Sequence, residues 1–123
     1  VLLTTLPGEQ HTMGLLMAEC MLALEGCERR SLGRDTPLSD VAQAAEHWQM
    51  DVVALSVSAL PVASSVWGGL RQLRAALPPR VAIWVRGSSA HLARRQVPEG
   101  IWVLQSVDAM GRQIQLWRAQ AGL

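Results

Sequence analysis

The sequence contains no lysine, no phenylalanine and no tyrosine, and it has two cysteines. Without a lysine, the chain cannot form a Schiff base or supply the lysine of a Walker phosphate-binding loop. Cys20 and Cys27 form no CxxC pair and indicate no disulfide framework, so we expect two buried thiols in a reducing cytoplasm. No apolar stretch approaches the roughly 18 residues that a membrane-spanning helix requires.

Charged residues are also few, at 17% of the chain, and the net charge of +1 gives no reason to expect nucleic-acid binding by these residues. Hydrophobic residues make up 50% of the 123, which is typical of one globular domain with a sizeable core. The chain starts inside an expected strand, without an initiator Met or the basic region of a signal peptide. We therefore expect residues 1–123 to be a single cytoplasmic domain, excised from a longer protein, with no membrane partner.

Apolar residues alternate between strand-like and helix-like spacing along the chain. Five strands are expected, at residues 1–5, 27–32, 51–58, 81–85 and 101–104. Helices are expected at residues 12–24, from residue 37, at residues 62–77, from residue 91 as a short helix, and at residues 107–121. This order predicts an α/β fold, a flavodoxin-like or Rossmann-like doubly wound sheet of five parallel strands in the order 2-1-3-4-5.

The spacing of apolar residues also predicts which side chains are buried. The strand at residues 51–58 carries a nearly continuous apolar run, as a strand covered on both faces should, whereas the charged strand at residues 27–32 is expected at an edge. The helix at residues 12–24 is expected to bury one face, made of Met13, Leu16, Met17, Cys20 and Leu24. The five tryptophans are expected in the core or at its rim rather than over a cofactor.

The turn after the first strand carries His11, with Glu9 before it and Gly14 after it. Turns at the carboxyl ends of parallel strands line the ligand crevice, and a neutral imidazole is a good ligand for a transition metal. Glu9 could then fix the tautomer of His11, and Gly14 would let a bulky group approach the backbone. The alternative from the residues alone is that His11 caps the following helix in solvent, since the histidines form no spaced metal cluster.

Ser56 and Ser58 end the third expected strand, which the predicted strand order places beside the first. His11 and Ser56 would then meet at one crevice, as a single ligand site requires. Ordinary turn chemistry is the other interpretation of two serines at a strand end. 

The segment at residues 9–14 reads EQHTMG and looks like the Asp-x-His-x-x-Gly signature of base-off/His-on cobalamin-binding domains, in its Glu-x-His form. With its flanks, the segment LPGEQHTMGLL at residues 6–16 resembles the cobalamin-binding domains of MerR-type transcriptional regulators, which include light-responsive repressors. The resemblance continues through SLG at residues 31–33 and TPL at residues 36–38 to DVVALSVS at residues 51–58. It covers most of the chain and weakens after about Val85.

The resemblance implies that a cobalamin (adenosyl-, methyl- or hydroxocobalamin) binds with His11 as the lower axial ligand of cobalt. Glu9 would orient His11, and the displaced dimethylbenzimidazole tail would enter a pocket between the sheet and the first helix. The implied cofactor-binding residues are Glu9, His11, Thr12, Gly14, Ser56, Ser58, Gly87 and Ser88. The family further implies an amino-terminal winged helix-turn-helix domain, a helical bundle over the corrin, DNA binding through the former, and homo-oligomers that respond to the cofactor.

Two positions depart from the family pattern. Ser58 stands where the family's Ser-x-Leu pattern has leucine, and Arg86 stands where the first of two adjacent glycines is expected, with Gly87 as the second. An arginine at this position could crowd the nucleotide tail or pair with its phosphate.

Other functions compete with that of a cobalamin sensor. A cofactor-free dimerisation or partner-binding module of the same fold is the main alternative, and Arg86 favours it. A phosphorylated receiver domain is excluded, since the third strand ends in Ser56 rather than Asp and the chain has no lysine. No GxGxxG or phosphate-binding loop follows a strand, and the catalytic modules of cobalamin enzymes are absent, so we expect no enzymatic activity.

Overall fold

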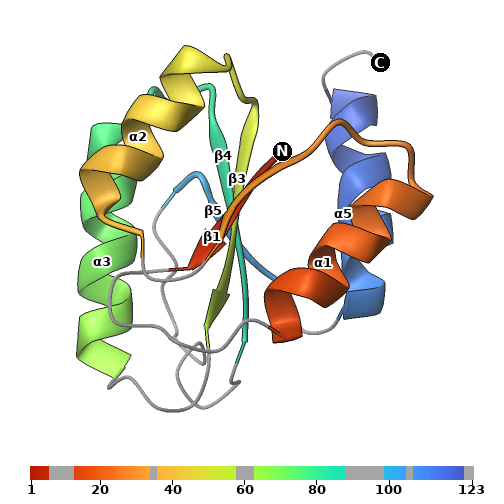
Figure 1. Cartoon of the computed structure of the whole chain (residues 1–123), viewed down its shortest axis with the longest axis horizontal. Helices are drawn as coiled ribbons and strands as arrows, with labels where there is room; N and C mark the ends of the chain where they lie inside the picture. The colour runs from red at the N-terminus through yellow and green to blue at the C-terminus, as the bar shows by residue number, and fades with distance from the viewer. Residues whose placement is uncertain (6–12, 34–35, 58–62, 88–98, 105–106, 121–123) are drawn as a thin grey trace.

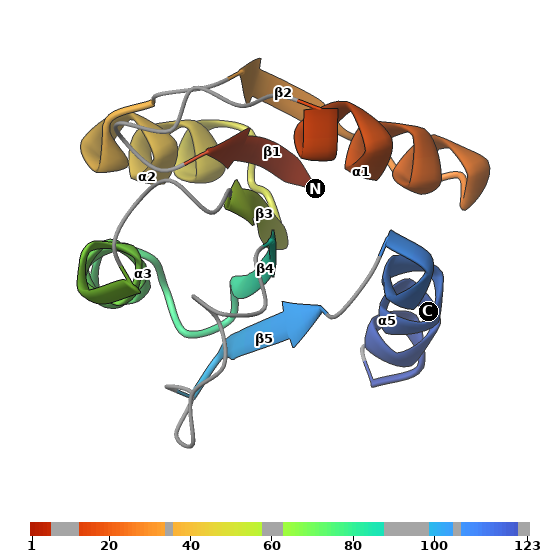
Figure 2. The same cartoon turned by 90° about the horizontal axis from the view of Figure 1, so that it is seen from below.

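A five-stranded parallel sheet lies between two helical layers in the computed structural model, which describes residues 1–5, 13–33, 36–57, 63–87, 99–104 and 107–120. The strands are β1 (Leu2–Thr5), β2 (Arg30–Gly33), β3 (Val52–Val57), β4 (Ala82–Gly87) and β5 (Ile101–Leu104). The helices are α1 (Met13–Leu24), α2 (Leu38–His47), α3 (Ala63–Ala76) and α5 (Val107–Gln120). Helices α2 and α3 cover one face of the sheet, and α1 and α5 cover the other (Figures 1 and 2).

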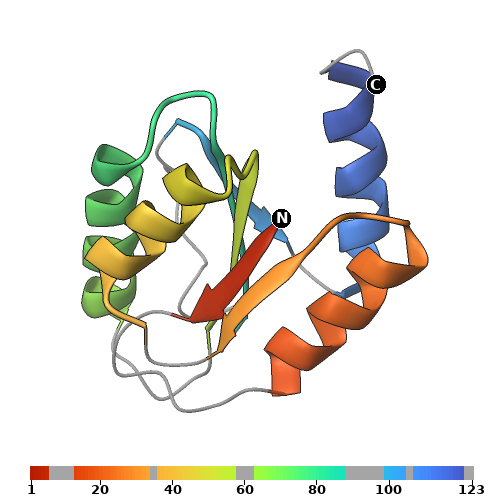
Figure 3. The same cartoon turned by 45° about the horizontal axis from the view of Figure 1, so that its top comes forward.

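The strand order is β2-β1-β3-β4-β5 and all pairings are parallel, which confirms the predicted topology. Strand β2 is the edge strand expected from its charge, and it runs beside β1 in the same direction (Figure 3). Strand β4 continues two residues beyond the predicted end at Val85, so that Arg86 and Gly87 are part of the sheet. The short helix expected from His91 lies outside the described residues.

The central strand β3 supplies side chains to both cores. Val53, Leu55 and Val57 pack in the core under α2 and α3, whereas Val52 and Ala54 pack in the core under α1 and α5. This alternation follows from the period of two along a strand, and burial on both faces explains the continuous apolar run.

The prediction for α3 is confirmed, because Val66, Leu70, Leu73 and Leu77 are all buried. Trp67 and Trp84 are fully buried core residues, and Trp117 packs partly buried against the second core. Trp48 and Trp102 lie at the surface, and the Arg30 guanidinium stacks 4.7 Å from the centre of the Trp48 ring.

The prediction for α1 is wrong, because most of the expected buried face is exposed. Leu16 and Leu24 are 54% and 81% exposed, and Met17 and Cys20 also face outward. Ala18 and Leu22 are the buried residues instead. The physical reason is that Glu19 is the one charged residue among the 12 of this helix, so the sequence offered little contrast between faces.

The expectation of two buried thiols is likewise wrong. Cys20 is exposed on α1, and Cys27 is half-buried in the segment before β2, where its Sγ lies 3.4 Å from a guanidinium nitrogen of Arg118. Both cysteines are free, as expected. None of the helices that the structure describes has the length and apolar character needed to cross a membrane.

Leu22→Ala and Leu16→Ala form a matched pair that tests which face of α1 is buried. Leu22→Ala should lower the free energy of unfolding by about 2–5 kcal/mol, because it empties a buried site. Leu16→Ala should change it by no more than about 0.5 kcal/mol, because that side chain is mostly in solvent. Urea denaturation of both variants measures the difference, and the reverse ranking would contradict the position of α1.

Candidate ligand site

A row of polar residues crosses the carboxyl ends of three neighbouring strands. In the parallel register, Thr5 of β1 pairs with Ser56 of β3, and Ser56 pairs with Arg86 of β4. Residues paired in this way face the same side of a sheet. The residues two positions earlier on these strands belong to the core under α1 and α5, so the polar row also faces that layer.

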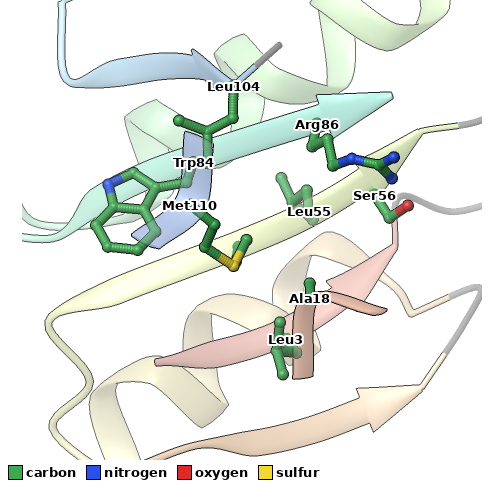
Figure 4. Close-up of a pocket in the computed structure, with 9 residues that line it drawn as sticks. Leu3, Ala18, Leu55, Ser56, Trp84, Arg86, Leu104 and Met110 are labelled. Atoms are coloured by element: carbon green, nitrogen blue, oxygen red, sulfur yellow. The ribbon is translucent and has the colours of Figure 1, made fainter. Parts of the chain in front are cut away.

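A small cavity lies beside this row, between the sheet and the two helices (Figure 4). Its free volume is about 10 Å³, which is about enough for one water molecule. Ala18 is its lining residue from α1, and Met110 is its lining residue from α5. The sheet contributes the remaining lining residues, which are Leu3, Ala54, Leu55, Ser56, Trp84, Arg86 and Leu104.

Two buried nitrogen atoms in the cavity wall, Nε1 of Trp84 and Nε of Arg86, have no hydrogen-bond partner within the part of the chain that the structure describes. A buried donor without an acceptor costs about 1–3 kcal/mol. Figure 4 shows the guanidinium of Arg86 reaching toward the hydroxyl of Ser56, with the indole nitrogen of Trp84 on the far side of its ring from Arg86. The two unpartnered donors therefore lie at different ends of the cavity.

The lining suits an apolar group that carries hydrogen-bond acceptors. Cofactor sites are mostly apolar with a few placed polar groups. Here Ser56 and Arg86 lie at the carboxyl end of the cavity, and the indole nitrogen of Trp84 lies away from them. The volume is smaller than a benzimidazole ring requires, so such a group enters only if lining side chains move. Met110 has three rotatable bonds, and Arg86 has a long side chain at the cavity's polar end, so these two can change position without a backbone shift.

A buried pair of threonines lies at the end of β1, on the face of the sheet opposite to the cavity. The hydroxyl oxygen of Thr4 lies 3.0 Å from the carbonyl oxygen of Gly33 and 2.8 Å from the hydroxyl oxygen of Thr36. Thr4 is fully buried and Thr36 is 9% exposed, so these bonds are shielded from water. They hold the start of α2 and the end of β2 against the strand that precedes His11.

The structure describes the positions of three predicted site residues. Ser56 lies in the cavity wall, Gly87 ends β4 next to Arg86, and Gly14 belongs to the first turn of α1. The other predicted site residues, Glu9, His11, Thr12, Ser58 and Ser88, lie outside the described residues, and their roles stay predictions. Within the described ranges, no group of three or more His, Cys, Asp and Glu side chains could hold a metal ion.

Sequence reasoning did not assign Trp84, Ala18 or Met110 to the site. Trp84 could have been predicted to line the site, because it stands two residues before Arg86 on the same strand and therefore lies on the same face of the sheet. Ala18 and Met110 had no such signal, because their place depends on how α1 and α5 pack on the sheet.

Comparison with curated proteins finds a relative among transcriptional regulators. The chain is 36% identical over 88 residues to the HTH-type transcriptional repressor CarH of Myxococcus xanthus. The match covers 72% of this chain and 29% of the repressor, so the chain spans less than a third of that protein. This relative is a repressor rather than an enzyme, in agreement with the expectation of a non-catalytic chain. No protein-family model matches the sequence.

Solved structures share the fold at low sequence identity. A cobalamin-binding protein from Desulfitobacterium hafniense superposes with a TM-score of 0.71, and the monomethylamine corrinoid protein of Methanosarcina barkeri with a TM-score of 0.67. Each is 19% identical to this chain, and each match covers 94% of this chain and 57% of the other. The doubly wound arrangement is thus common to all three.

Thr4→Val tests the buried threonine pair. This substitution leaves the Thr36 hydroxyl and the Gly33 carbonyl without their partner, so the free energy of unfolding should fall by about 1–3 kcal/mol. Ser39→Ala, at an exposed position of α2, is the control and should change stability by less than about 0.5 kcal/mol. Chemical denaturation measures both, and equal stability of the two variants would contradict the role assigned to Thr4.

Proposed function

We propose that this chain, which is related to the cobalamin-binding domains of MerR-type transcriptional regulators, is the cobalamin-binding sensory domain of a longer regulator. The observation that carries the proposal is the 36% identity to a transcriptional repressor over 88 residues. The shared fold with a cobalamin-binding protein and a corrinoid protein supports the choice of ligand. DNA binding and homo-oligomer formation would then belong to the full-length regulator.

His11 is the proposed lower axial ligand of cobalt. The segment that carries it joins β1 to α1, and both of these elements contribute a wall of the cavity, through Leu3 and Ala18. Glu9 is the proposed partner that orients the imidazole. When bound, the cobalamin would supply a cobalt centre with an exchangeable upper ligand. His11 would bind the cobalt from the lower face of the corrin ring, and Glu9 would orient His11.

The nucleotide tail is proposed to enter the cavity under α1. Ser56 lies in its wall, and Gly87 follows the lining residue Arg86 at the end of β4, in keeping with the roles that the family resemblance implies. Gly14 would give room at the first turn of α1. Thr12, Ser58 and Ser88 complete the proposed cofactor-binding set.

A cofactor-free dimerisation or partner-binding module is the second candidate. Two observations favour it, the cavity of about 10 Å³ and the exposed apolar side chains of Leu16, Met17 and Leu24 on α1. A module of this kind would bind its partner equally well with and without a cobalamin. Sedimentation of the chain with and without hydroxocobalamin separates the two candidates.

Titration with hydroxocobalamin tests the role of His11. The wild-type chain should give the spectral change of an imidazole-ligated cobalt, and His11→Ala should lose that change. Affinity should fall at least about tenfold, because loss of a ligand costs no less than loss of the group that orients it. Absorbance spectroscopy and dialysis equilibrium measure these effects.

His47→Ala is the matched control for this titration. His47 lies in the last turn of α2, on the opposite face of the sheet, and is exposed. Its loss should leave the spectrum and the affinity unchanged. Identical spectra of the wild type and His11→Ala in the presence of cobalamin would count against axial ligation by His11.

Ala18→Leu tests whether the cavity under α1 takes the tail. The added side chain fills the space beside Met110, so the affinity for hydroxocobalamin should fall at least about tenfold, while overpacking costs about 1–3 kcal/mol of stability. Ala23→Leu, at an exposed position of the same helix, should leave affinity unchanged. Equal affinities of the two variants would place the tail elsewhere.

A further inference from the structure

Arg86 differs from the other half-buried arginines of the described part of the chain. Arg74 donates to the carbonyl oxygens of Gly100 and Pro78, at 3.0 and 2.6 Å. Arg118 donates to the carbonyl oxygen of Glu25 at 3.0 Å. Arg86 has a buried Nε to which none of the described residues offers an acceptor.

The position of Arg86 makes this lack of an acceptor informative. The side chain lines the cavity next to Ser56, its register partner on β3, and both stand at the carboxyl end of the sheet. A guanidinium has five donors and no acceptor, and it binds phosphate and carboxylate through two parallel hydrogen bonds. The cavity therefore presents a cation and a hydroxyl donor to an anionic group that the described residues do not supply.

We propose that Arg86 is a specificity-determining residue that pairs with the phosphodiester of a corrinoid's nucleotide tail, with the Ser56 hydroxyl as a second donor. The inference rests on the proposed function, because it assumes that a corrinoid is the ligand. Arg86 then selects a complete cobalamin over a cobinamide, which has the same corrin ring but no nucleotide and no phosphodiester. The opposite effect, in which Arg86 obstructs the tail, predicts the reverse preference.

Binding of hydroxocobalamin and aquacobinamide to Arg86→Met distinguishes these effects, because methionine keeps much of the length but removes the charge and the donors. The affinity for hydroxocobalamin should fall about 10- to 100-fold, the loss expected for a charge-assisted hydrogen bond. The affinity for aquacobinamide should stay within about twofold. Arg86→Lys keeps the charge and should restore part of the preference. Arg71→Met, at an exposed position of α3, should leave both affinities unchanged.

Each other outcome has a definite meaning. Tighter binding of hydroxocobalamin to Arg86→Met, or equal weakening of both corrinoids, would overturn the inference while leaving corrinoid binding intact. Binding of inorganic phosphate alone, lost in Arg86→Met, would reassign the site to free phosphate and also overturn it. Failure of the wild-type chain to bind either corrinoid would contradict the proposed function itself, and the inference with it.

Discussion

The in-register parallel pairing of β1, β3 and β4 is the constraint on which the candidate site depends. It places Thr5, Ser56 and Arg86 in one row, although these residues are far apart in the sequence. A shift of one residue in either pairing would turn one member of the row toward α2 and α3. The buried apolar runs on both faces of β3 and β4 fix the register, so the hydrophobic core determines where the polar groups meet.

Two side chains of the helix that covers the row are buried among those described from residue 16 onward. They are Ala18 and Leu22, and the small side chain of Ala18 leaves the cavity beside it. The larger apolar side chains of this helix, such as Leu16 and Leu24, face outward. A helix held in this way covers the carboxyl end of the sheet without filling the space that a ligand would need.

The cavity also has an electrostatic character that the fold alone does not require. The fold supplies carbonyl acceptors to Arg74 and Arg118, which fasten α3 and α5 to neighbouring turns. Among the described residues, none offers an acceptor to Nε of Arg86. Arginines that fasten the fold can thus be distinguished from an arginine proposed to face a ligand by whether backbone carbonyl groups accept their hydrogen bonds. In a domain related to a transcriptional repressor, Arg86 is the proposed contact between the sheet and the ligand.

The order of the strands, the edge position of β2, the burial of β3 and the face of α3 could all be predicted from the residues, because each follows from local periodicity, charge and the connection rules of parallel sheets. The sequence also marked Arg86 as unusual, and Ser56 as a residue of the crevice. The burial of Ala18 and Leu22 on α1 could not be predicted in this way, since a helix that is apolar almost all round has no preferred face until α5 and the sheet pack against it. The hydrogen-bond partners of Thr4, and the lack of a described acceptor for Nε of Arg86, also depend on tertiary structure. Hydrogen bonds between distant segments produce no periodic sequence pattern from which they could be predicted.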